Sequence, residues 1–153
     1  MINCQFYRHV LRTLAAGSLL LTLIVVSACE KEKEPIRIGY VGGLTGRVAG
    51  LGIAGRDGAL LAIEEINSKG GINGRQVVLV VKDDQQMPEA AERVVKELIK
   101  EKVVAIVGHM TSSMTAVTLP IINEAKVVMV SPTSKSDIFS RQDDFFFRVT
   151  TSS

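Results

Sequence analysis

From Ile36 onward, short runs of β-branched and aliphatic residues alternate with longer amphipathic stretches, and this alternation limits the fold more than any other feature. The apolar runs predict strands at residues 36–41, 76–82, 103–107, 127–130 and 145–149. The stretches between them predict helices at residues 59–66, 88–101 and 112–125. Because strands that alternate with helices of about 10 to 15 residues form βαβ units, we expect an α/β fold with a doubly wound parallel sheet and helices on both of its faces.

Local signals set the limits of several elements. The apolar side of the first helix is expected at Ala59, Leu60, Ile63 and Ile66. That helix should end at the turn-forming residues 67–71, and Pro88 suits the first turn of the second helix. Pro120 is expected to delay or kink the third helix. Residues 77–81 are almost all β-branched, which favours a strand buried on both faces of the sheet.

Ligands of such folds bind beyond the carboxyl ends of the strands, where the strand order reverses. The loops that would meet there are residues 42–52, 108–113 and 131–136, and they are rich in hydroxyl groups and glycine. The hydroxyl-bearing residues are Thr45, Thr111, Ser112, Ser113, Ser131, Thr133, Ser134 and Ser136. Hydroxyls and backbone N–H groups at a helix start bind anions such as carboxylates, although Ser and Thr also serve simply as helix caps.

Two enzymatic interpretations are less well supported. Residues 50–55 match the pattern G-x-G-x-x-G, but a dinucleotide site needs its first glycine directly after the strand, and Gly50 comes well after Val41. His109 could activate Ser112 as a nucleophile, but no G-x-S-x-G elbow surrounds them. A structural hydrogen bond is the favoured role of His109, so we expect no enzyme and no cofactor.

Charged residues suggest neither a metal site nor nucleic acid as a partner. Asp83 and Asp84 are two adjacent carboxylates without other placed oxygens, which is a weak cation signal; lining the strand exit or capping the helix at Pro88 is favoured. The chain has 18 basic and 16 acidic residues. Without Arg8 and Arg12 of the N-terminal segment, 16 basic residues balance 16 acidic ones, whereas phosphate backbones require a basic surface.

The N-terminus has the layout of a secretory signal peptide. Arg8 and Arg12 precede an uncharged stretch at residues 13–28, which is shorter than the roughly 20 residues of a membrane-spanning helix. Residues 26–29, Val-Ser-Ala-Cys, resemble the bacterial lipobox, whose Cys is lipid-modified and becomes the new N-terminus. No Cys follows Cys29, so the mature chain offers it no disulfide partner.

These features predict three segments. Residues 1–28 form a lipoprotein signal peptide, residues 29–35 form a tether that begins at the lipidated Cys29, and residues 36–153 form one α/β ligand-binding lobe. The protein is therefore expected to be exported and anchored by lipid to the bacterial cell membrane or outer membrane. The chain stops at residues 150–153, which look like the cap of a further helix, so we expect the lobe to be incomplete.

An ordered series of short motifs connects the chain to a known family. The series consists of Ile38-Gly39, Leu44-Thr45-Gly46, Gly52, Gly58-Ala59, Ala62–Asn67, Gly70–Gly74, Asp83-Asp84, Val107-Gly108, Ser112-Ser113, Ser131–Thr133 and Phe147-Arg148. The series resembles the N-terminal lobe of the Leu/Ile/Val-binding family of periplasmic solute-binding proteins, over residues 36–153. The resemblance implies a type I periplasmic binding protein, in which two α/β lobes joined by a hinge grip a solute and deliver it to an ABC permease. The same fold also serves as the ligand-sensing domain of signalling receptors, which we keep as the alternative.

The resemblance also implies which residues touch the solute, an amino acid or a related small carboxylate. Contacts are expected from the first loop at Thr45, Gly46 and Leu51, and from the later loops at Met110, Thr111, Ser112, Thr133, Ser134 and Lys135. Ser112 would bind the carboxylate through its hydroxyl and N–H, and Thr133 would offer its carbonyl to the ammonium. Lys135 stands where amino-acid binders have Thr, and Leu51 where many have an aromatic residue, so the solute stays open.

Lipidation of Cys29 is directly testable. Cells fed labelled palmitate should incorporate label into the wild type and not into Cys29→Ala, because the acyl chains would be attached through this residue and would replace the removed helix as the membrane anchor. Equal labelling of the two proteins would contradict the prediction.

Overall fold

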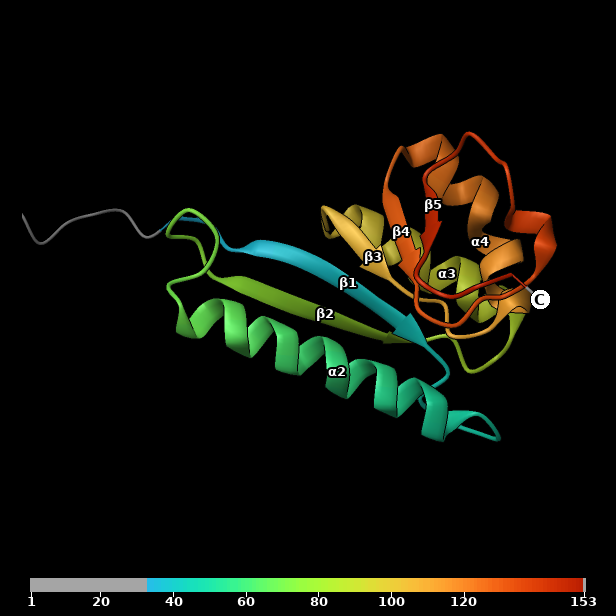
Figure 1. Ribbon diagram of the computed structural model, residues 1–153, viewed down its shortest axis with the longest axis horizontal. Helices are drawn as coiled ribbons and strands as arrows, with labels where there is room; N and C mark the ends of the chain where they lie inside the picture. Colours follow the sequence, from blue (N-terminus) through green and yellow to red (C-terminus); the bar gives the residue numbers. More distant parts are fainter. Residues whose placement is uncertain (1–32, 153) are drawn as a thin grey trace, which may run out of the picture. The chain divides into compact units, whose positions relative to one another are not determined.

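The computed structural model describes residues 33–152, and the segment that contains the lipobox and Cys29 lies outside them. Within this range a five-stranded parallel sheet has the strand order β2-β1-β3-β4-β5 (Figure 1). The elements in chain order are β1 (Ile36–Gly42), α2 (Ala49–Ser68), β2 (Val77–Asp83), α3 (Pro88–Lys100), β3 (Ala105–Val107), α4 (Ser112–Ala125), β4 (Val128–Ser131), the short 3-10 helix η1 (Asp137–Phe139) and β5 (Phe146–Arg148).

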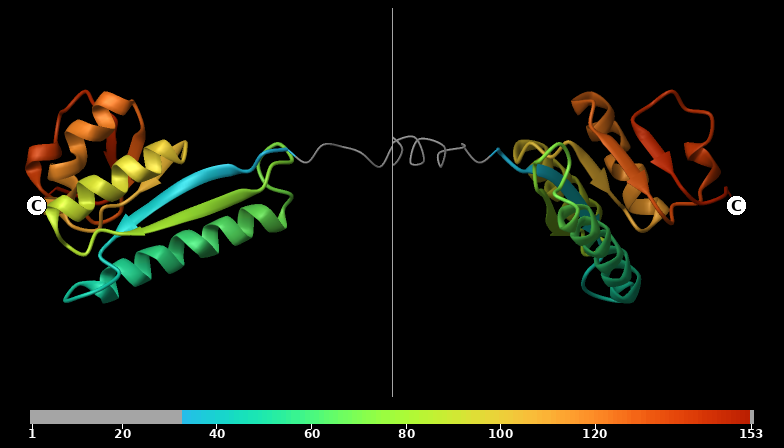
Figure 2. Two further views of the ribbon diagram at one scale, coloured as in Figure 1. Left: turned by 180° about the vertical axis from the view of Figure 1, so that it is seen from behind. Right: turned by 60° about the vertical axis from the view of Figure 1, so that its left-hand side comes forward.

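The helices cover both faces of the sheet. Helix α2 packs on β1 and β2, whereas α3 and α4 pack against each other on the opposite face (Figures 1 and 2). The crossover from β1 to β2 moves along the sheet in one direction, and the crossover from β2 to β3 passes β1 and moves in the opposite direction. Because both crossovers have the same hand, their helices lie on opposite faces of the sheet. The predicted α/β class, doubly wound parallel sheet and helices on both faces are confirmed.

The core lies between the sheet and the pair α3 and α4. One row of neighbouring residues crosses four strands under these helices: Gly39, Ile106, Met129 and Phe146. Leu98 of α3 fills the space above Gly39 and is completely buried. Phe139 of η1 closes the far end, with its ring centroid 5.0 Å from that of Phe146. Burial of each large apolar side chain contributes about 1.5 to 3 kcal/mol, so this row anchors β3, β4 and β5.

Three expectations about the elements need correction. Helix α2 begins at Ala49 rather than near Ala59, because four glycines mask the helical pattern of its first half. Leu60 is 37% exposed and contributes little to the apolar face. Strand β2 has α2 and α3 on its two faces but is not buried throughout, since Val77 is buried and Val78 is 37% exposed. Helix α4 spans its predicted range with Pro120 inside it, so the proline does not delay its start.

Helix α2 packs on one face of the sheet, over β1 and β2. The same face remains apolar over the strands that α2 does not cover. Tyr40, Val107, Val130 and Phe147 are register neighbours on this face. Tyr40 is completely buried beneath α2, while Val107 and Val130 are half-buried and Phe147 is 56% exposed. The apolar row therefore continues past α2 onto an open surface formed by β3, β4 and β5.

Close contact between α2 and the end of β1 fixes the first loop at the carboxyl edge. The Tyr40 hydroxyl donates a hydrogen bond to the carbonyl of Gly52, and burial together with the nearby Asp84 carboxylate raises the pKa of Tyr40 to about 12, so it stays a donor. A Cβ at Gly52 would lie 2.0 Å from the carbonyl oxygen of Gly43. Only glycine allows the helix to approach the strand end this closely.

Substitution of this glycine should therefore separate α2 from the sheet. We expect Gly52→Ala to lower the free energy of unfolding by about 2 to 3 kcal/mol, because the overlap is with backbone that cannot move aside. The matched control is Gly58→Ala in the same helix, where a Cβ meets nothing within 4 Å. Its better helix propensity should raise stability by about 0.5 to 1 kcal/mol. Urea unfolding would measure both, and equal stability of the two variants would contradict this account.

Candidate ligand-binding rim

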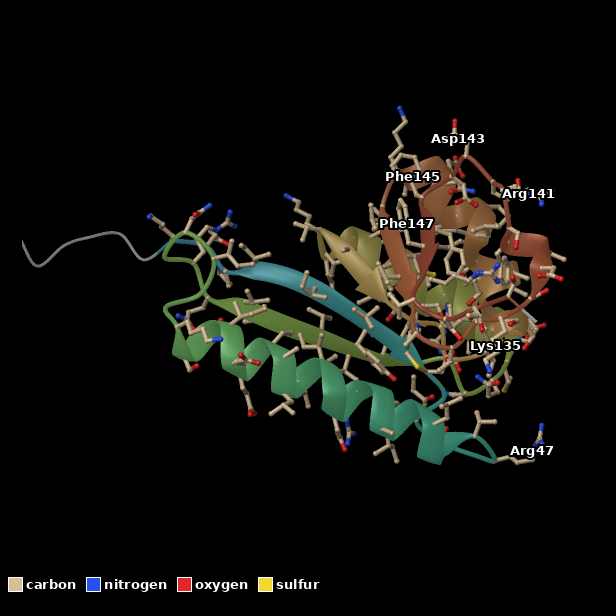
Figure 3. All side chains as sticks on the ribbon, in the orientation of Figure 1. Arg47, Lys135, Arg141, Asp143, Phe145 and Phe147 are labelled. Atoms are coloured by element: carbon tan, nitrogen blue, oxygen red, sulfur yellow. The ribbon has the colours of Figure 1, made fainter. Side chains whose placement is uncertain are left out.

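The reversal of strand order lies between β1 and β3, and the loops that follow the strands meet at this edge. We call this edge the rim and define it as residues 43–48, 84–87, 108–113 and 132–136. Arg47 and Lys135 project from this end of the sheet, where β1 and β4 finish (Figure 3). In these loops, backbone and side-chain polar groups are organised in two layers, one exposed and one buried.

The first rim loop is held by Asp83 at the end of β2. Its carboxylate accepts hydrogen bonds from the backbone N–H of Leu44 at 2.8 Å, the hydroxyl of Thr45 at 2.7 Å and the backbone N–H of Gln85 at 2.8 Å. Burial alone would raise the pKa of Asp83, but the hydrogen bonds from Thr45, Gln85 and Leu44 outweigh it and hold this pKa below its ordinary value. The ionised carboxylate therefore sets the path of the loop.

The loops after β3 and β4 are tied to each other. The Ser112 hydroxyl oxygen accepts from the backbone N–H groups of Lys135 at 3.1 Å and Ser136 at 3.3 Å. In return, the Thr133 hydroxyl donates to the carbonyl of Met110 at 2.7 Å. Ser112 is also the first residue of α4, where backbone N–H groups lack partners within the helix. The two loops thus present one connected surface around the start of α4.

A second polar layer is buried beneath this surface. The Nδ1 atom of His109 lies 2.7 Å from Oδ2 of Asp84, and both side chains are completely buried. The predicted structural hydrogen bond of His109 is thereby confirmed. Neither Asp83 nor Asp84 caps α3, whose N-cap Met87 has no side-chain cap bond, so that part of the expectation was wrong. Both carboxylates instead line the exit of β2.

The rim brings together the loops that the sequence predicted, but the predicted contact residues differ in exposure. The predicted ligand contacts that are exposed or partly exposed are Thr45, Gly46, Leu51, Thr111, Ser112, Thr133 and Lys135. Leu51 lies in the first turn of α2, not in a loop, and is 43% exposed. Met110 and Ser134 have buried side chains and support the surface from below. Sequence reasoning assigned no role to Gln86 or Thr115, which bond to rim residues but carry no recognisable motif.

Other features of the described chain lie apart from the rim. Among residues 33–152, no three His, Cys, Asp or Glu side chains come together to hold a metal ion, and no helix has the length and apolarity to cross a membrane. One surface hollow lies along the exposed side of α3 and a second lies at the amino ends of β1 and β3, and both are lined mainly by charged residues. Neither includes a rim residue.

An open parallel sheet with helices on both faces and a hydroxyl-rich rim at its reversal point defines a ligand-binding α/β lobe. The sequence profile described as periplasmic binding protein matches residues 35–153. The chain belongs to this periplasmic binding protein family.

Two proteins of similar sequence are binding proteins for amino acids. The leucine-, isoleucine-, valine-, threonine- and alanine-binding protein of Pseudomonas aeruginosa is 38% identical over 116 residues, which are 75% of this chain and 31% of that protein. The Leu/Ile/Val/Thr-binding protein of Salmonella typhimurium is 32% identical over 79% of this chain and 32% of its own length. The chain thus spans about a third of the length of these relatives.

A solved structure gives the same result. The substrate binding protein of the branched-chain amino acid transporter from Streptococcus pneumoniae, in complex with isoleucine, superposes with a TM-score of 0.74 at 35% identity. The superposition covers 77% of this chain and 34% of that protein. Both comparisons support the N-terminal lobe of a branched-chain amino acid binding protein, which is the family that the sequence motifs predicted.

The role of Asp83 predicts a pH-dependent stability. Its folded pKa lies below the ordinary value of 3.8, so its contribution is complete above that pH and is lost as the pH falls through the lower folded pKa. We expect Asp83→Asn to lower the free energy of unfolding by about 1 kcal/mol near neutral pH, and the difference from wild type should shrink below about pH 4. Chemical unfolding between acidic and neutral pH would measure it, with exposed Asp143→Asn as the control for the change in net charge. A difference that grows on acidification would contradict the prediction.

Proposed function

We propose that this chain contains the N-terminal lobe of an extracytoplasmic solute-binding receptor for an ABC importer, and that its rim binds an amino acid or a related small carboxylate. The observation that carries the proposal is the start of α4, where Ser112 is bonded across to the β4 loop while the first N–H groups of the helix remain available. A helix N-terminus of this kind favours an anion through its N–H groups and its dipole.

Hydrogen-bond accounting shows which groups of the rim remain for a solute. A hydroxyl has one hydrogen to donate and two lone pairs. Ser112 uses its oxygen to accept from Lys135 and Ser136, so its hydrogen is left to donate to a carboxylate. Thr45 and Thr133 are in the opposite situation: their hydrogens are used on Asp83 and on the Met110 carbonyl, so their lone pairs are left to accept from an ammonium.

Exposed charge at the rim also supports an anionic group on the solute. Within the rim segments, the exposed charged residues that the structure describes are Arg47 and Lys135, both cations (Figure 3). Asp83 is tied into the first loop and Asp84 is buried, so neither presents its carboxylate oxygens to an incoming solute. Leu51 adds exposed apolar surface beside the first loop, where an aliphatic part of a solute would fit.

The segment boundaries of the proposal follow the sequence: residues 1–28 as signal peptide, 29–35 as a tether from lipidated Cys29, and 36–153 as part of the lobe. The open apolar face at Val107, Val130 and Phe147 supports a lobe that is completed by further chain, as do relatives about three times as long. Sequencing the gene beyond Ser153 separates the two candidate roles. A second lobe followed by a stop codon supports the importer receptor, whereas a membrane-spanning helix with a signalling domain supports the sensing alternative.

Binding by the rim can be tested with the complete gene product. Titration calorimetry against the 20 L-amino acids and a set of small carboxylates should identify a ligand, and Ser112→Ala should then weaken its binding about 10- to 100-fold. The reason is that a hydrogen bond to a charged group is worth about 1.5 to 3 kcal/mol and about 1.4 kcal/mol equals one decade.

The matched control is Ser68→Ala at the end of α2, where the serine hydroxyl bonds only the local carbonyl of Glu65. This variant should bind as tightly as the wild type. If Ser112→Ala retains full affinity, the assigned carboxylate contact is wrong, and if no compound of the panel binds, the proposed solute class is wrong.

A further inference from the structure

We propose that Asp84 and His109 act as a buried positioning pair, which fixes the rim loops after β2, β3 and β4 relative to one another. Solute affinity then depends on two side chains that the solute does not contact. Both are completely buried, so direct contact with a ligand is not their role. The inference rests on the proposed function for its effect on affinity, while the effect on the loops can be measured without any solute.

Asp84 connects the loop after β2 to the loop after β3. Its Oδ1 atom accepts from the backbone N–H of Gln86 at 2.9 Å and from the Gln86 side-chain amide at 3.1 Å. The amide oxygen of Gln86 then accepts from the hydroxyl of Thr111 at 3.1 Å. The second carboxylate oxygen of Asp84 meets Nδ1 of His109 at 2.7 Å. One buried carboxylate thus holds both ends of the segment from His109 to Thr111.

His109 extends the connection to the loop after β4. Its main-chain carbonyl accepts from the hydroxyl of Ser131 at 2.6 Å and from that of Ser134 at 3.3 Å. The Ser134 hydroxyl also lies 2.7 Å from that of Thr115 in α4. Since the next residue, Met110, accepts from Thr133, the segment pinned by the imidazole determines where the carbonyl and hydroxyl groups of the β4 loop lie.

The imidazole of His109 makes one hydrogen bond, which joins it to Asp84. In its bond to the Asp84 carboxylate Nδ1 is the donor, so Nε2 is the remaining polar atom of the ring. Nε2 is buried without a hydrogen-bond partner among the described residues. Burying an unpaired nitrogen is unfavourable compared with an apolar side chain, so the contribution of His109 lies in its bond to Asp84 and in the loop geometry that this bond sets.

A series of substitutions at position 109 separates positioning from general stability. His109→Asn places an amide donor near the position of Nδ1, and His109→Gln places its amide donor away from that position. His109→Leu has no hydrogen-bond donor. The matched control is Asn67→Ala at the opposite edge of the sheet, where the Asn67 side chain donates to the Val77 carbonyl at 2.7 Å and accepts from the Val77 N–H at 2.8 Å. That substitution also removes structural hydrogen bonds, which are partly buried, but should leave the rim unchanged.

Two measurements on the complete gene product decide the proposal. In the solute-free protein, His109→Leu should raise amide hydrogen exchange in residues 108–115 and 131–136 by about tenfold, and calorimetry should show binding of L-leucine weakened by about tenfold. His109→Asn should restore most of both quantities. Asn67→Ala should lower the melting temperature by a comparable amount and leave rim exchange and the affinity per folded molecule unchanged. If His109→Leu does not fold, His109→Gln replaces it, with the same expected direction.

The outcomes are distinguishable. The positioning role is overturned if the position-109 variants and Asn67→Ala change rim exchange and affinity equally at the same loss of stability. It is also overturned if His109→Asn fails to restore slow exchange in the rim. If the wild type binds no L-leucine, the failure concerns the proposed solute, and the exchange comparison still decides whether the pair positions the loops.

Discussion

The position of β1 between β2 and β3 is the constraint on which the other features depend. The chain leaves β1 toward β2 on one side and later returns to β3 on its other side, so no crossover covers the gap between the loops that follow β1 and β3. Polar backbone at such a gap has no sheet or helix partner and needs side-chain bonds instead. Asp83 provides such a bond to the backbone N–H of Leu44 in the first loop, while Asp84 bonds the His109 side chain of the loop after β3.

This arrangement gives the rim a defined geometry before any solute arrives. Most of its hydroxyl groups are already engaged with neighbouring loops, and Ser131, Ser134 and Thr115 are wholly buried. Ordering flexible loops upon binding reduces affinity, so loops that are already fixed leave more of the contact energy for the solute. The close approach of α2 at Gly52 has the same effect on the first loop, since it holds Gly43 against the helix.

The fold could be predicted from the sequence because it follows from local periodicity, whereas the buried layer of the site could not. Strand limits are correct to within about two residues, and α4 spans its predicted range. The start of α2 was missed because glycine lowers helix propensity, and only contact with Gly43 explains why Gly52 is there. The bond between Asp84 and His109 joins residues far apart in sequence, and neither has a motif around it that would indicate the other.

The charges of the rim restrict how it can bind an amino acid. A carboxylate has suitable partners in the start of α4, the free hydrogen of Ser112 and the nearby cations. For an ammonium, the exposed part of the rim offers neutral lone pairs such as those of Thr45 and Thr133, whereas Arg47 and Lys135 oppose it and the oxygens of Asp83 and Asp84 are already bonded to protein groups. Removing an ammonium from water without a counter-charge is unfavourable. Either the solute is an anion without an ammonium group, or an acidic residue beyond the rim segments completes the site. The affinities for an amino acid and for its deaminated analogue, measured on the complete gene product, distinguish these two cases. Only in the second case should the amino acid bind more tightly than the analogue, because only then does its ammonium meet a carboxylate.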